Sequence, residues 1–187
     1  NVAGPQIEDI ITNWTIKYWL CKPHFVKTNK YECGVKNGYK NPKQLGVDRW
    51  LALIGAHGLK TGTNLCILDC GSAITIDILT ANGQHLGGVI TPGLRMMQTA
   101  LAQNTYELTD CNRTLIKFSL ANETGDGIIL GTSYAVLGLL EHVMRELDEQ
   151  PELILTGGDA IAIEPFLSRN YQYIPDLVLQ GLKTVLS

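Results

Sequence analysis

The chain has 187 residues, of which 45% are hydrophobic and 18% are charged, and its formal net charge at pH 7 is −3. This composition excludes an intrinsically disordered chain, and the small negative charge argues against a protein that binds nucleic acid or an anionic membrane surface. The sequence has no run of 18 apolar residues, so it predicts no transmembrane helix. We therefore expect a soluble globular protein.

The first third of the chain shows helical spacing twice. Apolar residues share one helical face over residues 7–20 and again over residues 47–59, so both segments are predicted to be helices. Between them we expect a short strand at residues 24–26, which follow a proline. Residues 27–44 are rich in Lys, Asn and Gly and are predicted to form a loop or an irregular hairpin.

The glycine-containing stretch at residues 61–64 predicts a domain boundary, with residues 1–61 in one domain and residues 62–187 in a second. In the second domain, Asn82-Gly83 is the strongest hairpin signal of the chain. The expected strands are residues 65–68, 73–79, 85–90, 153–155 and 171–174. One helix is expected after Pro92-Gly93, ending near Gln103, and the others are expected at residues 124–147, 159–168 and 177–186.

Three antiparallel strands, then helices, then alternating strand and helix is the order found in the ribonuclease H-like topology. The sequence therefore predicts an α/β protein with a ribonuclease H-like (actin-like ATPase) fold. Its five cysteines form no CxxC pair and lie near no histidine at zinc spacing, which is typical of free thiols in a reducing compartment. We expect a cytoplasmic protein with free thiols at Cys21, Cys33, Cys66, Cys70 and Cys111.

Two glycine turns follow predicted strands. In Asp69-Cys70-Gly71-Ser72, the glycine lets backbone N–H groups approach a phosphate, while the carboxylate and the hydroxyl can reach a cation or a phosphate oxygen. Thr156-Gly157-Gly158 follows a buried strand and opens a helix, a common ligand position in α/β folds. Each turn alone fits an ordinary loop without a ligand equally well. On this topology, the pair resembles the phosphate and adenosine elements of the acetate kinase, sugar kinase, Hsp70 and actin superfamily.

A third polar group surrounds the start of the helix predicted at residues 47–59. An Asp at a helix N-terminus is stabilised by the helix dipole, so one interpretation is a capping Asp48 beside a solvated Arg49. The functional interpretation makes Asp48 a base that accepts the proton of an attacking hydroxyl. Arg49 would then bind an anion, and Tyr39 would bound a small substrate pocket.

Four motifs, in this order, resemble those of the type III pantothenate kinases. The resemblance covers nearly everything from residue 37 to the end of the chain. The motifs are Gly46-Val47-Asp48-Arg49 after Tyr39, Asp69-Cys70-Gly71-Ser72-Ala73, Gly87-Gly88-Val89-Ile90-Thr91-Pro92-Gly93, and Leu155-Thr156-Gly157-Gly158.

The resemblance implies ATP-dependent phosphorylation of pantothenate to 4'-phosphopantothenate, the first step of coenzyme A biosynthesis. It implies that Asp48 is the proton acceptor and that Asp69 binds a monovalent cation, K⁺ or NH₄⁺. Ser72 stands where the family has a Thr, and serine keeps the hydroxyl. The implied pantothenate contacts are Tyr39, Gly46, Val47, Asp48, Arg49 and Thr124, and the implied ATP contacts are Gly71, Ser72, Gly157 and Gly158.

The resemblance also implies a homodimer with the pantothenate site at the subunit interface, so Thr124 is expected to act from the partner chain. Family members begin with an Asp-x-Gly-Asn-Thr/Ser phosphate loop, which would supply an Asp that coordinates Mg²⁺. No segment of this sequence matches that loop. We therefore expect the chain to be part of a longer protein of two similar domains, with the first domain incomplete.

Two other functional classes share this fold. A catalytically silent regulatory or accessory protein would be consistent with the unmatched phosphate loop, whereas the set formed by Tyr39, Asp48, Arg49, Asp69 and Thr124 favours the kinase. A ribonuclease H-like nuclease would need several carboxylates around two metals, and the glycine-rich turns argue against it.

We expect the histidines and Asp77 to have no role in the reaction, and a catalytic role for Asp77 is the less favoured alternative. The histidines have no partner at ligand spacing, so we expect them to be structural or to lie on the surface. The alternation of residues 73–79 predicts that Asp77 points outward from its strand. The histidines are His24, His57, His85 and His142.

Overall fold

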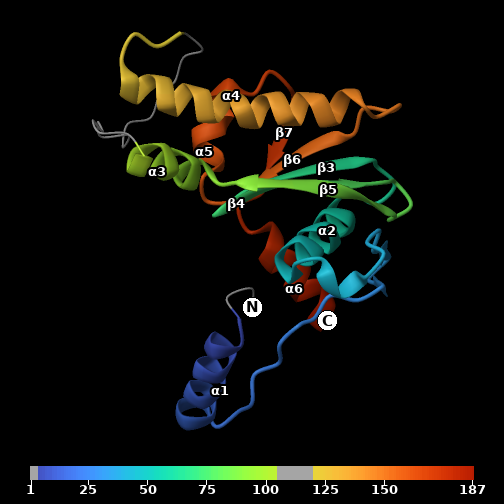
Figure 1. Cartoon of the computed structure of the whole chain (residues 1–187). Coiled ribbons are helices and arrows are strands. Elements are labelled where there is room, and N and C mark those ends of the chain that lie inside the picture. The colour runs from blue at the N-terminus through green and yellow to red at the C-terminus, as the bar shows by residue number, and fades with distance from the viewer. Residues whose placement is uncertain (1–3, 105–119) are drawn as a thin grey trace.

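The structure is a computed structural model that describes residues 4–104 and 120–187. A five-stranded sheet lies at its centre, with helices on both faces (Figure 1). The described cysteines are free thiols, as predicted, and Cys111 lies outside the described residues.

The central sheet has the strand order β5-β4-β3-β6-β7. β4 pairs antiparallel with β3 and with β5, and β6 lies parallel to both β3 and β7. Three antiparallel strands extended by two parallel strands form the ribonuclease H-like arrangement, so the predicted α/β fold class is confirmed. The strands are β3 (Leu65–Cys70), β4 (Ala73–Leu79), β5 (His85–Pro92), β6 (Glu152–Thr156) and β7 (Tyr171–Tyr173).

Helices bury both faces of this sheet. On one face, α2 and α6 pack over a core that includes Ile67 and Leu79. On the opposite face, α3, α4 and α5 cover a second core that includes Ile76. Because successive side chains of a strand point to opposite faces, Asp77 points towards the α2 layer. The helices are α2 (Val47–Leu59), α3 (Leu94–Asn104), α4 (Thr124–Arg145), α5 (Ala160–Ile163), which continues into a 3₁₀ turn at Glu164–Phe166, and α6 (Leu177–Leu186).

By length and composition alone, α4 could cross a membrane. The core helix of a soluble protein passes the same test. One side of α4 buries Val136, Leu140 and Met144 in the core that covers the sheet. We therefore assign α4 to the core of this domain.

The N-terminal segment departs from the prediction at one point. α1 (Pro5–Trp19) forms where a helix was expected, and the expected irregular hairpin consists of β1 (Tyr31–Glu32) and β2 (Val35–Lys36), followed by a 3₁₀ turn at Pro42–Gln44. The strand predicted at residues 24–26 is wrong, because this described stretch pairs with no neighbouring strand. Without a partner, an extended segment has no ladder of hydrogen bonds to hold it.

Candidate functional site

A buried ion pair joins the first turn of α2 to β4. The Arg49 guanidinium binds both carboxylate oxygens of Asp77, with Nε 2.8 Å from Oδ2 and Nη2 2.6 Å from Oδ1. Arg49 is 5% exposed and Asp77 is 2% exposed. Burial would by itself lower the pKa of Arg49, but the hydrogen bonds and charge of Asp77, followed by those of Tyr39, raise it above its ordinary value. The guanidinium therefore stays charged inside the protein.

His85 and Tyr39 extend this cluster. The buried His85 ring lies with Nε2 2.8 Å from Asp77 Oδ1. The Gly38 backbone N–H donates to His85 Nδ1 over 3.4 Å, which assigns the proton of the neutral ring to Nε2. The Tyr39 ring stacks on His85 with ring centroids 5.9 Å apart, and the Tyr39 hydroxyl oxygen accepts a 2.8 Å hydrogen bond from Arg49 Nη1.

The burial of Asp77 corrects the expectation that it points outward. Alternation along β4 places Ile76 and Asp77 on opposite faces, but helices cover both faces of this central strand. A polar residue on the second face is therefore buried against α2 instead of facing water. The available signal was a single Asp in an apolar strand together with a single Arg in an apolar helix, and only the tertiary structure pairs them.

Asp48 lies beside this pair, in the first turn of α2. Its Oδ1 accepts a 2.8 Å hydrogen bond from the Arg49 backbone N–H, which leaves Oδ2 for a substrate group. Gly46 is the N-cap of α2 and Val47 is its first residue. A Cβ at position 46 would lie only 2.5 Å from Asp48 Oδ1, so the glycine keeps space for this carboxylate. The motif predicted at residues 46–49 thus forms one continuous turn, linked to Tyr39 through Arg49.

Asp69 lies near the C-terminal end of β3, opposite Thr75 and Thr156 of the neighbouring strands. Burial, and then the negative charges of Asp48 and Asp77, raise the pKa of Asp69 to about 6. Carboxylates from α2, β3 and β4 therefore converge closely enough to affect one another. Such a concentration of buried negative charge favours the binding of a cation.

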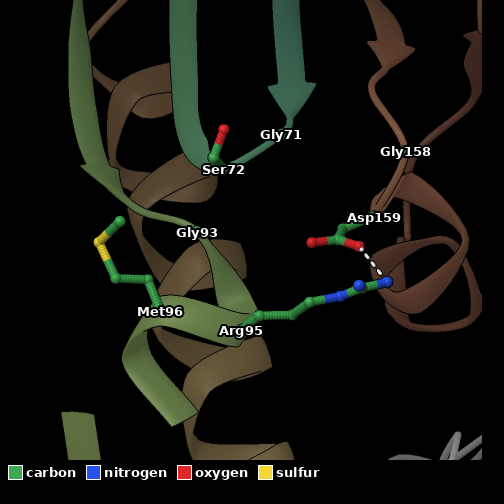
Figure 2. A pocket seen from close by; sticks show the side chains of 7 residues that line it. All are labelled: Gly71, Ser72, Gly93, Arg95, Met96, Gly158 and Asp159. Carbon is green, nitrogen blue, oxygen red and sulfur yellow. Dashed lines mark ion pairs between the residues drawn. The ribbon is translucent and has the colours of Figure 1, made fainter. Parts of the chain in front are cut away.

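The glycine turns lie next to the end of β3, around an open pocket of about 440 Å³ (Figure 2). Gly157 shapes the second turn, with a φ of +93° that favours glycine, and a Cβ there would lie 2.5 Å from Asp69 Oδ1. An ion pair of 3.1 Å between Arg95 and Asp159 lies at the pocket. The lining residues are Gly71, Ser72, Gly93, Arg95, Met96, Gly158 and Asp159.

Thr124, the last predicted substrate residue, lies elsewhere. It begins α4 and lines an apolar groove of about 940 Å³ along α3 and α4. Because α4 and α2 cover opposite faces of the sheet, the described part of one chain does not bring Thr124 to Asp48.

The described residues differ in how well they fit the two expected ions. Within residues 4–104 and 120–187, no group of three or more His, Cys, Asp or Glu side chains could hold a metal ion. A monovalent cation can be held by a few carboxylate and carbonyl oxygens. Asp69 offers such an oxygen in a region of converging carboxylates, so it fits a monovalent cation.

This arrangement can support one type of reaction. A carboxylate with a free oxygen, a buried guanidinium and a phenol surround the start of α2, and a glycine-lined pocket follows the end of β3. The first group can orient a small hydroxyl-bearing substrate, and the pocket can accept phosphate groups. Together they suit the transfer of a phosphoryl group to a hydroxyl.

Comparisons with known proteins support this chemistry. The family model for type III pantothenate kinase matches residues 1–146. Two relatives named type III pantothenate kinase, from Nitrosococcus oceani and Nitrosospira multiformis, are 36% and 35% identical to this chain over 99% of its length, which spans 73% and 71% of theirs. A solved structure from Campylobacter jejuni, described as a conserved protein of the Baf transcriptional activator family, is 28% identical with a TM-score of 0.57. That alignment covers 77% of this chain and 64% of the solved one.

Proposed function

The chain belongs to the type III pantothenate kinase family, and from this premise we propose a role for each part of the candidate site. As a family member, the chain is a kinase that phosphorylates pantothenate in coenzyme A biosynthesis. The observation that carries the assignment of roles is the placement of Asp69 between the Asp48 turn and the second glycine turn. After burial, the charge of Asp48 is the next cause of the raised pKa of Asp69, and a Cβ at Gly157 would lie 2.5 Å from Asp69 Oδ1.

Pantothenate binds at the start of α2. Tyr39 and residues 46–49 bound this site, and Asp48 Oδ2 orients the primary hydroxyl of the substrate. The guanidinium of Arg49 provides the positive charge nearest to the substrate carboxylate, although Asp77 already balances much of it. The substrate is therefore recognised through the oriented donors of Arg49 and Tyr39 more than through net charge.

ATP binds with its phosphates in the glycine-lined pocket. Gly71 and Ser72 contact the phosphates, and Gly157 and Gly158 lie beside the adenosine. The substrate hydroxyl oxygen attacks the γ-phosphorus, the bond from that phosphorus to the β,γ-bridging oxygen breaks, and ADP leaves with the electron pair. Asp48 accepts the hydroxyl proton late in the reaction. Because the transition state of phosphoryl transfer is loose, positioning accounts for most of the rate enhancement.

Asp69 holds a monovalent cation, K⁺ or NH₄⁺, which offsets phosphate charge when bound. The geometric support for this role is the position of Asp69 near the end of β3, beside the glycine turn at Gly157. Burial first, and then the charges of Asp48 and Asp77, raise the pKa of its carboxyl, and a bound cation would offset those charges. Mg²⁺ accompanies the ATP phosphates, and we assign it no ligand among the described residues.

The protein acts in the cytoplasm as a homodimer. Thr124 reaches the pantothenate site of the partner chain, because it lies on the sheet face opposite to α2 within its own chain. The support for the interface is the apolar groove that contains Thr124.

A coupled assay of ADP release tests the proposed function, with full-length protein, ATP, Mg²⁺ and K⁺, with and without pantothenate. We expect turnover that depends on pantothenate and that falls when Na⁺ replaces K⁺. The Asp69→Asn variant should lose the difference between K⁺ and Na⁺. Turnover that is equal in both salts would contradict the cation site and leave the kinase assignment intact.

A second candidate function is an accessory protein without catalysis. The observation in its favour is the description of the Campylobacter jejuni relative as a transcriptional activator. The same assay separates the two, because an accessory protein would release no ADP in response to pantothenate.

A further inference from the structure

The buried pair of Arg49 and Asp77 is unlike an ordinary surface ion pair. Taking both charges out of water costs more than their attraction recovers unless further hydrogen bonds satisfy them, so burial of such a pair is a poor route to stability. Here Arg49 follows Asp48 in the first turn of α2, the turn to which we assign pantothenate, and Asp77 reaches it from β4. This placement points to a function for the pair beyond stability, in which Asp77 takes part.

Two glycines leave space for the side chains of this cluster, one of them in β5. A Cβ at Gly88 would lie 2.4 Å from Asp77 Oδ1 and 2.7 Å from Arg49 Nη2. A Cβ at Gly38 would lie 2.1 Å from the His85 backbone oxygen. The two glycines therefore let β5 and the Tyr39 loop close tightly around the polar cluster, which leaves Arg49 little freedom to adopt another rotamer.

Each member of the cluster fixes the next. His85 Nε2 donates to Asp77 Oδ1, and both Asp77 oxygens hold Arg49. Arg49 Nη1 then donates to the Tyr39 hydroxyl, and the Tyr39 ring stacks on His85. The four side chains form a closed set in which no member can turn without breaking a contact of another.

These four side chains determine the direction in which the hydroxyl proton of Tyr39 points. A guanidinium can only donate hydrogen bonds, so the Tyr39 oxygen must accept from Arg49 and its own proton must point elsewhere. Tyr39 is half-buried, so its hydroxyl proton is available to a substrate at the mouth of the site. A positively charged donor also polarises the phenol and makes it a stronger donor itself.

We propose that Asp77 and His85 are positioning residues of the pantothenate site, which hold Arg49 and thereby orient the Tyr39 hydroxyl as a hydrogen-bond donor to an acceptor oxygen of the substrate. This inference rests on the proposed function. Neither residue touches the substrate; both act through Arg49 and Tyr39. The consequence is a defect specific to the binding of pantothenate and absent from the binding of ATP.

The test compares the KM for pantothenate with the KM for ATP in full-length variants. We expect Asp77→Asn to raise the KM for pantothenate about tenfold or more, the effect of losing one charge-assisted hydrogen bond, with the KM for ATP unchanged within about twofold. His85→Phe keeps the ring that stacks on Tyr39 and removes the donor to Asp77, and it should shift the same constant by a smaller factor. His85→Gln restores a donor and should recover part of the affinity.

A double variant distinguishes positioning from structural damage. If Asp77 acts only through Arg49, then adding Asp77→Asn to Arg49→Ala causes no further rise in the KM for pantothenate. Removing both partners also leaves no unpaired buried charge, so the double variant should fold even if Asp77→Asn alone does not. The matched control is Glu141→Gln, which removes the charge and one of the two acceptors from the exposed bidentate pair of Glu141 with Arg169 at 2.8 Å and 2.7 Å. It should change neither constant.

Three results would overturn the inference. The first is a KM for pantothenate that is unchanged in both His85→Phe and Asp77→Asn. The second is a parallel rise of the KM values for pantothenate and ATP. The third is a double variant in which the effects of Asp77→Asn and Arg49→Ala on the KM for pantothenate multiply. Each of these leaves an active wild type and so overturns only the positioning role. A wild type that releases no ADP in response to pantothenate overturns the proposed function and the positioning role together.

Discussion

Among single residues, Asp48 is the one whose chemistry the proposed reaction requires. Its Oδ1 is held by the Arg49 backbone N–H, so only Oδ2 can accept the substrate proton. In Asp48→Asn, the amide oxygen can still accept from Arg49, but the group can no longer take up a proton. We expect turnover to fall at least about 100-fold, in the range of general-base losses, while the KM for ATP stays near the wild-type value.

Steady-state kinetics of ADP release, with a melting curve for each protein, checks this prediction. Because Asp and Asn have nearly the same shape, the melting temperature should hardly change. A variant that keeps half of the wild-type turnover would exclude Asp48 as the proton acceptor.

Gly46 controls the position of the same carboxylate. A Cβ at position 46 would meet Asp48 Oδ1 at 2.5 Å, and that atom ends a side chain that can rotate away. We therefore expect Gly46→Ala to displace the carboxylate and to lower turnover about tenfold or more, because small errors of position are costly in catalysis. The loss of stability should stay below about 1 kcal/mol, the usual size of an N-cap effect.

The control for Gly46→Ala is its effect in a protein whose Asp48 is already inactive. In an Asp48→Asn background, Gly46→Ala should cost no further turnover, because the group that it displaces is already inactive. Independent losses in the double variant would mean that Gly46 acts through the backbone of the turn and not through Asp48.

The sequence supplies candidate residues for the site but does not show which side chains hold them in place. Tyr39, Asp48 and Arg49 are candidates because of their positions around a helix start. The structure places Asp48 and Arg49 in the first turn of α2 and joins Tyr39 to them through its hydrogen bond with Arg49 Nη1. Asp77 was expected to face water, because strand alternation distinguishes two faces without saying which one is buried. His85 was expected to be structural or exposed, because it has no partner at ligand spacing along the sequence. Their importance depends on contacts between β4, β5 and α2, segments that are separated along the chain and are joined only by the fold.

At the scale of elements, the closest helix contact is between α2 and α6, where glycines replace larger side chains. A Cβ at Gly181 would lie 1.9 Å from the Leu51 backbone oxygen, which cannot move without distorting α2. We expect Gly181→Ala to destabilise the protein by about 1–3 kcal/mol, the usual cost of overpacking. For a chain of this size, each kcal/mol lowers the melting temperature by about 2–4 °C.

Gly58→Ala, in the last turn of α2, is the matched control. No atom lies within 4 Å of the Cβ position at Gly58, so alanine should leave stability unchanged or raise it by up to about 1 kcal/mol through its helix propensity. Thermal unfolding of both variants by circular dichroism measures the difference. Equal melting temperatures would show that the two helices can separate enough to accept a methyl group at residue 181.

Helices and strands with a clear spacing of apolar residues were predicted well. The strand predicted at residues 24–26 was not, for a physical reason. The helix predicted at residues 47–59 has the bounds found for α2, because its apolar face and its flanking residues agree. The strand predicted at residues 24–26 did not form, because local composition cannot show whether a pairing partner lies beside it. The same limit applies to burial, which depends on the layers that cover the sheet.

For the molecule as a whole, the two faces of the sheet divide the predicted substrate residues. Tyr39 and residues 46–49 lie with α2 on one face, and Thr124 lies with α4 on the other. The described part of one chain therefore does not bring the predicted set together, and the proposed dimer would supply the Thr124 hydroxyl from a second copy. Along α4, the small residues Gly127, Gly131 and Ala135 line the groove that contains Thr124, which would allow close approach of a partner helix.

Gly131→Leu tests this arrangement because it affects the monomer and the dimer in opposite directions. Leucine is a better helix former than glycine, which is about 0.8–1 kcal/mol less favourable than alanine, so the exposed position on α4 should tolerate leucine within one chain. Across a tightly packed interface, the larger side chain should prevent association. We expect light scattering to show a monomer, with a raised KM for pantothenate and an unchanged KM for ATP, because in the proposed dimer only the pantothenate site uses Thr124 of the partner. Gly58→Leu places the same side chain on an exposed helical glycine outside the groove and should remain dimeric. A Gly131→Leu protein that stays dimeric with an ordinary KM for pantothenate would place the interface elsewhere on the molecule.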